Sequence, residues 1–170
     1  TFHTYSFGNY YDPNRMGFGT LRVLNDDIIE AGKGFGKHPH RNMEIITIPT
    51  EGKLGHGDNM GNQTVILKGE VQAMSAGTGV IHSEMNASET EPAKIFQIWI
   101  ETRDENIKPQ YSQMKFEATD RQNKWQLVVA PNTAEENAVK IHQDAWLSLG
   151  NFDADQAVNY TLKNPSKIGR

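Results

Sequence analysis

Short runs of Val, Ile, Phe and Trp recur along the chain, and Gly, Asn and Pro separate them. No long helical period of apolar residues lies between the runs, so the pattern predicts many strands and an all-β fold. Candidate strands cover residues 20–24, 27–31, 44–48, 53–58, 63–67, 71–75, 80–86, 94–101, 125–130, 139–142 and 145–150. Segments 59–62, 68–70 and 76–79 have the residues of hairpin loops and tight turns. Short strands at this spacing favour a barrel or a sandwich.

The length of 170 residues fits one large domain, or one domain and part of another. Residues 102–123 are polar and rich in charges, which predicts a linker. We therefore expect an N-terminal domain over residues 1–101, a linker over 102–123 and the start of a second domain over 124–170. The residues after the linker are too few to close a second β-domain.

Composition excludes several classes of protein. The absence of cysteine excludes disulfides, thiolate-held metal sites and cysteine nucleophiles, so any metal ion must be held by His, Asp or Glu. A formal charge of −4, without a run of Lys or Arg, indicates no direct binding to nucleic acid or to an anionic membrane. No apolar stretch approaches the ~20 residues that span a bilayer, and no leader opens the chain, so we expect a cytoplasmic protein. Small molecules or protein surfaces are the favoured partners.

Two motifs carry the metal chemistry. His38 and His40 follow a glycine-rich stretch and are one residue apart, so in a strand both imidazoles project to the same face. His82 and Glu84 repeat this spacing after another glycine-rich bend. Imidazoles with a carboxylate suit iron, zinc, copper or nickel and leave coordination positions open. Either pair alone is more often a surface or packing feature, but together they predict a metal site.

The other histidines give weaker signals. His56 lies between two glycines and is either a group at the rim of a pocket or an exposed loop residue, and the exposed loop is favoured. His142, beside Asp144, is expected to be structural, and His3 is expected to be a residue of the terminus.

At these motifs the sequence resembles the cupins. The first cupin motif is matched by Gly32, His38, His40 and Glu44, and the second by Gly79, His82 and Asn86. Gly77 stands where the general motif has proline. With this glycine, and in five separate blocks, the sequence is similar to the pirin family, including its bacterial quercetinase-like members. The blocks are Phe7–Pro13, Gly34–Arg41, Asp58–Gly61, Met74–Glu84 and Phe96–Trp99.

The resemblance implies a bicupin. Its N-terminal cupin, a double-stranded β-helix or jelly-roll barrel, is expected to be complete and to hold one divalent metal ion. The second cupin is expected to be truncated. The ligands of the family map onto His38, His40, His82 and Glu84, with iron(II) as the expected ion and zinc, copper, nickel or manganese as alternatives. Glu44 ligates in many other cupins, but here we expect it outside the ligands, where it would orient an imidazole.

The resemblance also implies a quercetin 2,3-dioxygenase-like enzyme, which opens the heterocyclic ring of a flavonol with O₂ and releases carbon monoxide. Glu84 would be the catalytic base for the 3-hydroxyl proton. Five side chains would form an apolar slot for the flat substrate, although each is more often plain core: Phe35, Met43, Met74, Phe96 and Trp99. One alternative is a non-enzymatic metal- or redox-sensing pirin that binds a protein partner as a transcription cofactor. Another is a different cupin reaction on an enolic metabolite or a metal-assisted isomerisation.

Overall fold

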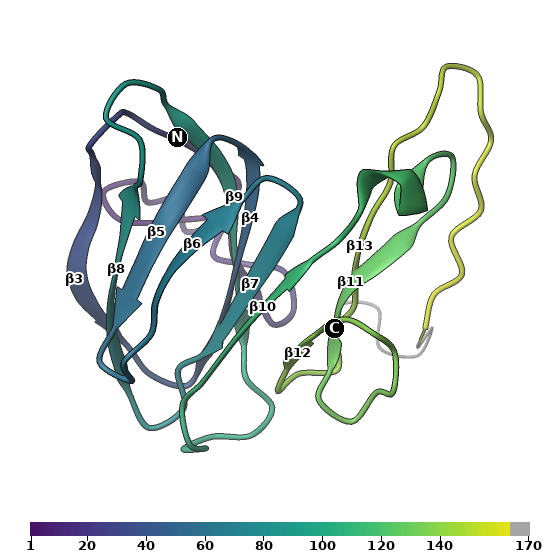
Figure 1. Ribbon diagram of the computed structural model, residues 1–170. Helices are drawn as coiled ribbons and strands as arrows, with labels where there is room; N and C mark the ends of the chain where they lie inside the picture. The colour runs from purple at the N-terminus through teal and green to yellow at the C-terminus, as the bar shows by residue number, and fades with distance from the viewer. Residues whose placement is uncertain (164–170) are drawn as a thin grey trace.

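The computed structural model describes residues 1–163, and the regular elements among them are strands, apart from one short 3₁₀ helix (Figure 1). The strands are β1 Phe2–His3, β2 Leu21–Ile29, β3 Gly34–His40, β4 Met43–Glu51, β5 Lys53–Asp58, β6 Gln63–Leu67, β7 Glu70–Ser75, β8 Val80–Asn86, β9 Ala93–Glu101, β10 Gln110–Lys115, β11 Gln126–Pro131, β12 Val139–Ile141 and β13 Leu147–Leu149. A short 3₁₀ helix, η1, covers Ala118–Arg121. Within residues 1–163, no helix is long and apolar enough to cross a membrane.

Two antiparallel sheets form the N-terminal barrel. One has the order β1-β2-β9-β4-β7-β10 and the other the order β3-β8-β5-β6. The sheets face each other, because apolar side chains from both meet in the interior. One such cluster joins Ile29 and Ile95 of the first sheet to Leu54 and Ile66 of the second. The expected all-β barrel is confirmed.

The C-terminal sheet packs on the outside of this barrel. Its order is β12-β11-β13, with β11 and β12 parallel and β11 and β13 antiparallel. Its apolar residues and the outward-facing residues of the larger barrel sheet form one cluster, which includes Ile46, Ile48, Ala73, Ile98, Val128, Val129, Val139 and Ile141. The C-terminal sheet therefore shares a hydrophobic core with the barrel.

Strand β4 is buried on both faces, which explains its apolar sequence. Ile45 packs inside the barrel, whereas Ile46 and Ile48 pack against the C-terminal sheet. Successive side chains point to opposite faces of a strand, so one strand serves both cores.

Two expectations about the strands are wrong. The two segments expected over 20–24 and 27–31 are joined in one strand, β2 Leu21–Ile29, because its polar residues Asn25 and Asp27 alternate into the buried face instead of making a turn. Segment 102–123, expected as a linker, contains β10, which pairs with β7. Its polar sequence suits a strand whose side chains make hydrogen bonds, and the hydroxyl groups of Tyr111 and Thr64 lie 2.6 Å apart.

The turn between β7 and β8 requires glycine at position 77. Gly77 has a φ of +46°, and a Cβ there would overlap the carbonyl oxygen of Ile107. Gly61, in the β5–β6 hairpin, has a φ of +97°, but a Cβ there meets nothing within 4 Å. We expect Gly77→Ala to lower the free energy of unfolding by about 2–4 kcal/mol, since it adds overlap to backbone strain, and Gly61→Ala by about 1–2 kcal/mol. Urea unfolding of both variants measures this, and equal losses would contradict the assigned collision.

Candidate metal centre

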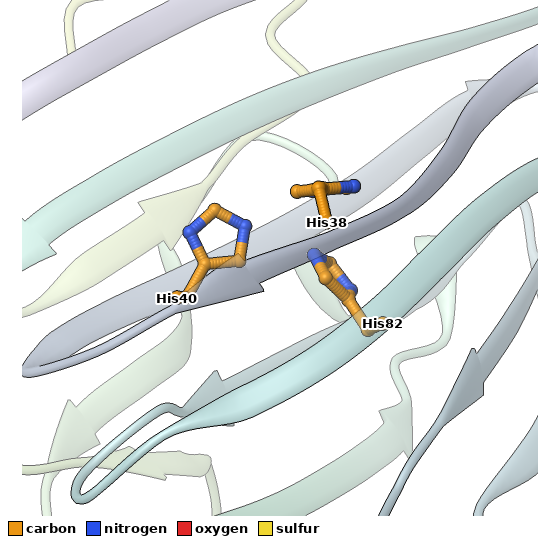
Figure 2. A group of neighbouring side chains, drawn as sticks. All are labelled: His38, His40 and His82. Carbon is orange, nitrogen blue, oxygen red and sulfur yellow. The ribbon is translucent and has the colours of Figure 1, made fainter.

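Three histidines from two neighbouring strands face one another inside the barrel. His38 and His40 extend from β3 and His82 from β8, and their imidazoles point toward a common centre (Figure 2). His38 lies directly opposite His82 in the sheet. The ring centroids are separated by 4.4 Å for His38 and His82, 4.8 Å for His38 and His40, and 4.9 Å for His40 and His82. One ring nitrogen of each lies within 4.8 Å of the others, a spacing that one metal ion can bridge.

The protonation of these imidazoles suits metal binding. The Nδ1–H of His38 donates to the carbonyl oxygen of Gly36 at 2.7 Å, so Nε2 carries the lone pair. Nε2 of His40 and both ring nitrogens of His82 are buried and have no hydrogen-bond partner among the described residues. Burial, followed by the charge of His38, lowers the pKa of His40 to about 4 and, with further neighbouring histidines, that of His82 to about 3. Both are therefore neutral at pH 7, the form that binds metal ions.

Glu84 lies next to this group on the inner face of β8. Its side chain is buried, Oε1 accepts a hydrogen bond of 3.0 Å from the Thr47 hydroxyl, and Oε2 accepts one from Nε2 of Gln97. Burial raises the pKa of Glu84, although both hydrogen bonds oppose the shift. Its carboxylate forms a compact donor group with His56 and His82, separate from His38 and His40. The structure therefore connects Glu84 to the three-histidine group through His82.

His56 is not an exposed loop residue, contrary to expectation. It is the fourth residue of β5, is 3% exposed and lies opposite Glu84. Its Nε2 lies 2.9 Å from Oδ2 of Asp58, and both side chains are fully enclosed. The flanking glycines suggested a loop, but period-two alternation within the correctly predicted strand 53–58 would have placed His56 and Asp58 on one face.

Hydrogen bonds keep Asp58 ionised beside His56. Burial alone would raise the pKa of Asp58, but hydrogen bonds from His56, Asn62 and Met60 outweigh it and lower the pKa below its usual value. Asp58 therefore both holds His56 and organises the β5–β6 hairpin loop.

Glu44 does not orient a ligand imidazole, and that expectation is wrong. It is fully buried, but on the face of β4 that carries Ile46 and Ile48, and its Oε2 accepts a hydrogen bond of 2.6 Å from the Ser75 hydroxyl. Strand β3 ends at His40 and β4 begins at Met43, so the alternation of side chains does not continue from His40 to Glu44. Glu44 thus faces away from the histidines.

The five expected slot residues separate into different places. Met43, Met74 and Trp99 belong to one interior cluster, and the Trp99 ring lies 4.7 Å from that of His40 in an edge-on contact. Phe35 packs in another interior cluster with Leu54. Phe96 is 38% exposed and alternates with the inward-facing Gln97, so it cannot line the interior. His142, as expected, lies outside this site, with hydrogen bonds to Asn132 and Gln110.

A barrel of two facing sheets, with histidines from adjacent strands directed to one point, defines the chain as a cupin. The Pirin family model matches residues 1–100. A second model, described as the quercetinase C-terminal cupin domain, matches residues 127–168. The chain belongs to the pirin family.

Relatives of known structure support the same assignment. Quercetin 2,3-dioxygenase of Escherichia coli (strain K12) is 54% identical over 147 residues, which cover 86% of this chain and 62% of that protein. The crystal structure of YhhW from Escherichia coli matches with a TM-score of 0.81 and 52% identity, over 86% of this chain and 61% of that chain. Bacterial pirin YhhW in complex with nickel(II) matches with a TM-score of 0.77 and 52% identity, over 84% of this chain and 60% of that chain. The chain spans about three fifths of the length of these relatives.

Proposed function

We propose that this chain is the metal-binding part of a flavonol dioxygenase, which opens the heterocyclic ring of a flavonol such as quercetin with O₂ and releases carbon monoxide. One divalent ion, iron(II) in our assignment, is bound by His38, His40, His82 and Glu84. The observation that carries the proposal is the convergence of three imidazoles, in which Nε2 of His40 and both ring nitrogens of His82 are buried without a hydrogen-bond partner among residues 1–163. The dioxygenase name of the Escherichia coli relative supports the reaction, and the nickel(II) complex of YhhW supports a divalent ion.

The residues present fit such an ion. Neutral imidazoles and one carboxylate are donors that iron(II), nickel and zinc accept, and three or four protein ligands leave coordination positions open. The Gly36 carbonyl fixes the ring of His38, as outer partners do for metal-binding histidines.

Bound by these residues, the ion would supply a Lewis acid that favours the deprotonated flavonol oxygen. Glu84 accepts the 3-hydroxyl proton, while Thr47 and Gln97 hold its carboxylate in place. The half-buried side chains of Met43 and Trp99 offer an apolar wall beside His40 for a flat aromatic ring. Together these groups orient the substrate and exclude water from it.

Metal removal tests this function. We expect chelated protein to consume quercetin about 100-fold more slowly than protein reloaded anaerobically with iron(II) and then given air, because the Lewis acid contributes several kcal/mol to the barrier. Flavonol absorbance and released carbon monoxide are measured together, with His82→Gln carried through the same loading as a control. Loaded protein that leaves flavonols unchanged, yet binds a protein partner in only one redox state, would favour the sensor instead.

A further inference from the structure

A second group of metal-type donors lies on the β5 side of the barrel interior and shares His82 with the first. His56, His82 and Glu84 are all buried, and one donor atom of each lies within 4.8 Å of the others. We propose that the ion has an alternative position in this group, where His56 takes the place of His38 and His40 as nitrogen ligand. The inference rests on the proposed function in so far as that function places an ion inside the barrel.

The hydrogen bonds of His56 prepare it as a ligand. Its Nε2 lies 2.9 Å from the Asp58 carboxylate, which fixes the ring proton on that nitrogen. Nδ1 is then the nitrogen with the lone pair, and it is buried without a hydrogen-bond partner in the described part of the chain. A carboxylate on the far nitrogen is the usual outer partner of a metal-binding histidine. The Asp58 pairing thus gives His56 the same preparation that the Gly36 carbonyl gives His38.

Among residues 1–163, no group donates a hydrogen bond to Nδ1 of His56. The Tyr111 ring lies against His56 at a tilt of 34°, with 4.8 Å between centroids, but its hydroxyl donates to Gln113 at 2.8 Å. The remaining neighbours in this group are the ring of His82 and the carboxylate of Glu84. Buried imidazole nitrogens without a hydrogen-bond partner are unfavourable. A divalent ion would bind Nδ1 of His56 and a ring nitrogen of His82, and Glu84, which Thr47 and Gln97 already hold in place, would supply the third donor atom.

The two positions exclude each other. A neutral imidazole has one lone pair, so His82 can bind only one ion at a time. The stoichiometry therefore stays at one ion per chain, while the ligand set differs between the two positions. Loss of a histidine on β3 should consequently weaken binding without abolishing it, whereas loss of the shared His82 removes both positions.

Cobalt(II) binding to the full chain tests the proposal, with affinity from equilibrium dialysis and ligand geometry from the visible absorption of the ion. We expect His38→Gln to retain one ion with affinity about 10–100-fold lower and an altered spectrum, because the ion moves to the His56 group. The double variant His38→Gln/His56→Gln should lose at least a further 100-fold. His82→Gln alone should match the double variant, and His142→Gln, a histidine outside the barrel, should change neither reading.

Two results would overturn the proposal. One is an unchanged affinity when His56→Gln is added to His38→Gln; the other is a spectrum of His38→Gln that equals that of the native chain. The spectrum of His38→Gln needs no substitution at position 56, so it tests the proposal even if variants with His56→Gln fail to fold. Thermal unfolding of the metal-free variants detects such a failure. Native chain that binds no cobalt(II) would refute the proposed function as well, whereas native binding with either result above refutes this inference alone.

Discussion

Glu84→Gln is expected to lower metal affinity and flavonol turnover by on the order of 1,000-fold, because it replaces the buried carboxylate that we assign as a ligand of the ion. The carboxylate is enclosed and already held by Thr47 and Gln97, so its position is fixed before any ion arrives. Glutamine keeps the volume of the side chain and removes the charge. Metal content and flavonol turnover are measured on the same preparation.

Glu44→Gln is the matched control, since it makes the same change in the six-stranded sheet, on the face that is turned away from the barrel interior. Glu44 contacts Ser75 and faces the C-terminal sheet, so we expect metal content and turnover to stay at the native level. The cost should appear in the free energy of unfolding, at about 1 kcal/mol for a weakened buried hydrogen bond. Full occupancy in Glu84→Gln, or an emptied site in Glu44→Gln, would show that the wrong carboxylate has been assigned.

Val129→Asp is expected to unfold the protein. Val129 is fully buried on β11, in the core that the C-terminal sheet shares with the barrel. An unpaired carboxylate there costs several kcal/mol, which approaches the whole stability of a domain of this size. Because the core is shared, the barrel should unfold with the C-terminal sheet in a single transition, followed by circular dichroism during heating.

Val65→Asp makes the same substitution where it should be tolerated. Val65 is 46% exposed on β6, so its carboxylate remains in water and the loss should be about 1 kcal/mol or less. Two separate melting transitions in Val129→Asp, with the barrel transition unchanged, would show that the C-terminal sheet is an independent unit.

Local sequence predicted much of the barrel. Strands 53–58, 63–67 and 80–86 were predicted with the bounds that the structure has. Each is an alternating or apolar run, and residues that favour turns follow it, as Lys68 and Gly69 follow 63–67. The motif spacing also predicted that His38, His40 and His82 would meet, because residues two apart on a strand share a face.

The remaining features depend on contacts that local patterns do not contain. The face of Glu44 depends on the break between β3 and β4, and Asn42 there has a φ of +48°. Strand β10 is polar because its partners are hydrogen-bonding groups on β6 and β7. The shared core could not be predicted either, because β4 and β9 are buried on both faces only when the C-terminal sheet covers them.

The hydrogen bonds of Glu84 give the barrel a mechanical property. Glu84 belongs to the four-stranded sheet, whereas its donors Thr47 and Gln97 are paired residues of the six-stranded sheet. The next residue along each donor strand, Ile48 and Ile98, packs against the C-terminal sheet. A single carboxylate therefore links all three layers of the molecule. A change in the coordination of Glu84 would alter the stiffness of all three sheets. The rate of amide hydrogen exchange would then change in β11 of the C-terminal sheet as well as in the barrel.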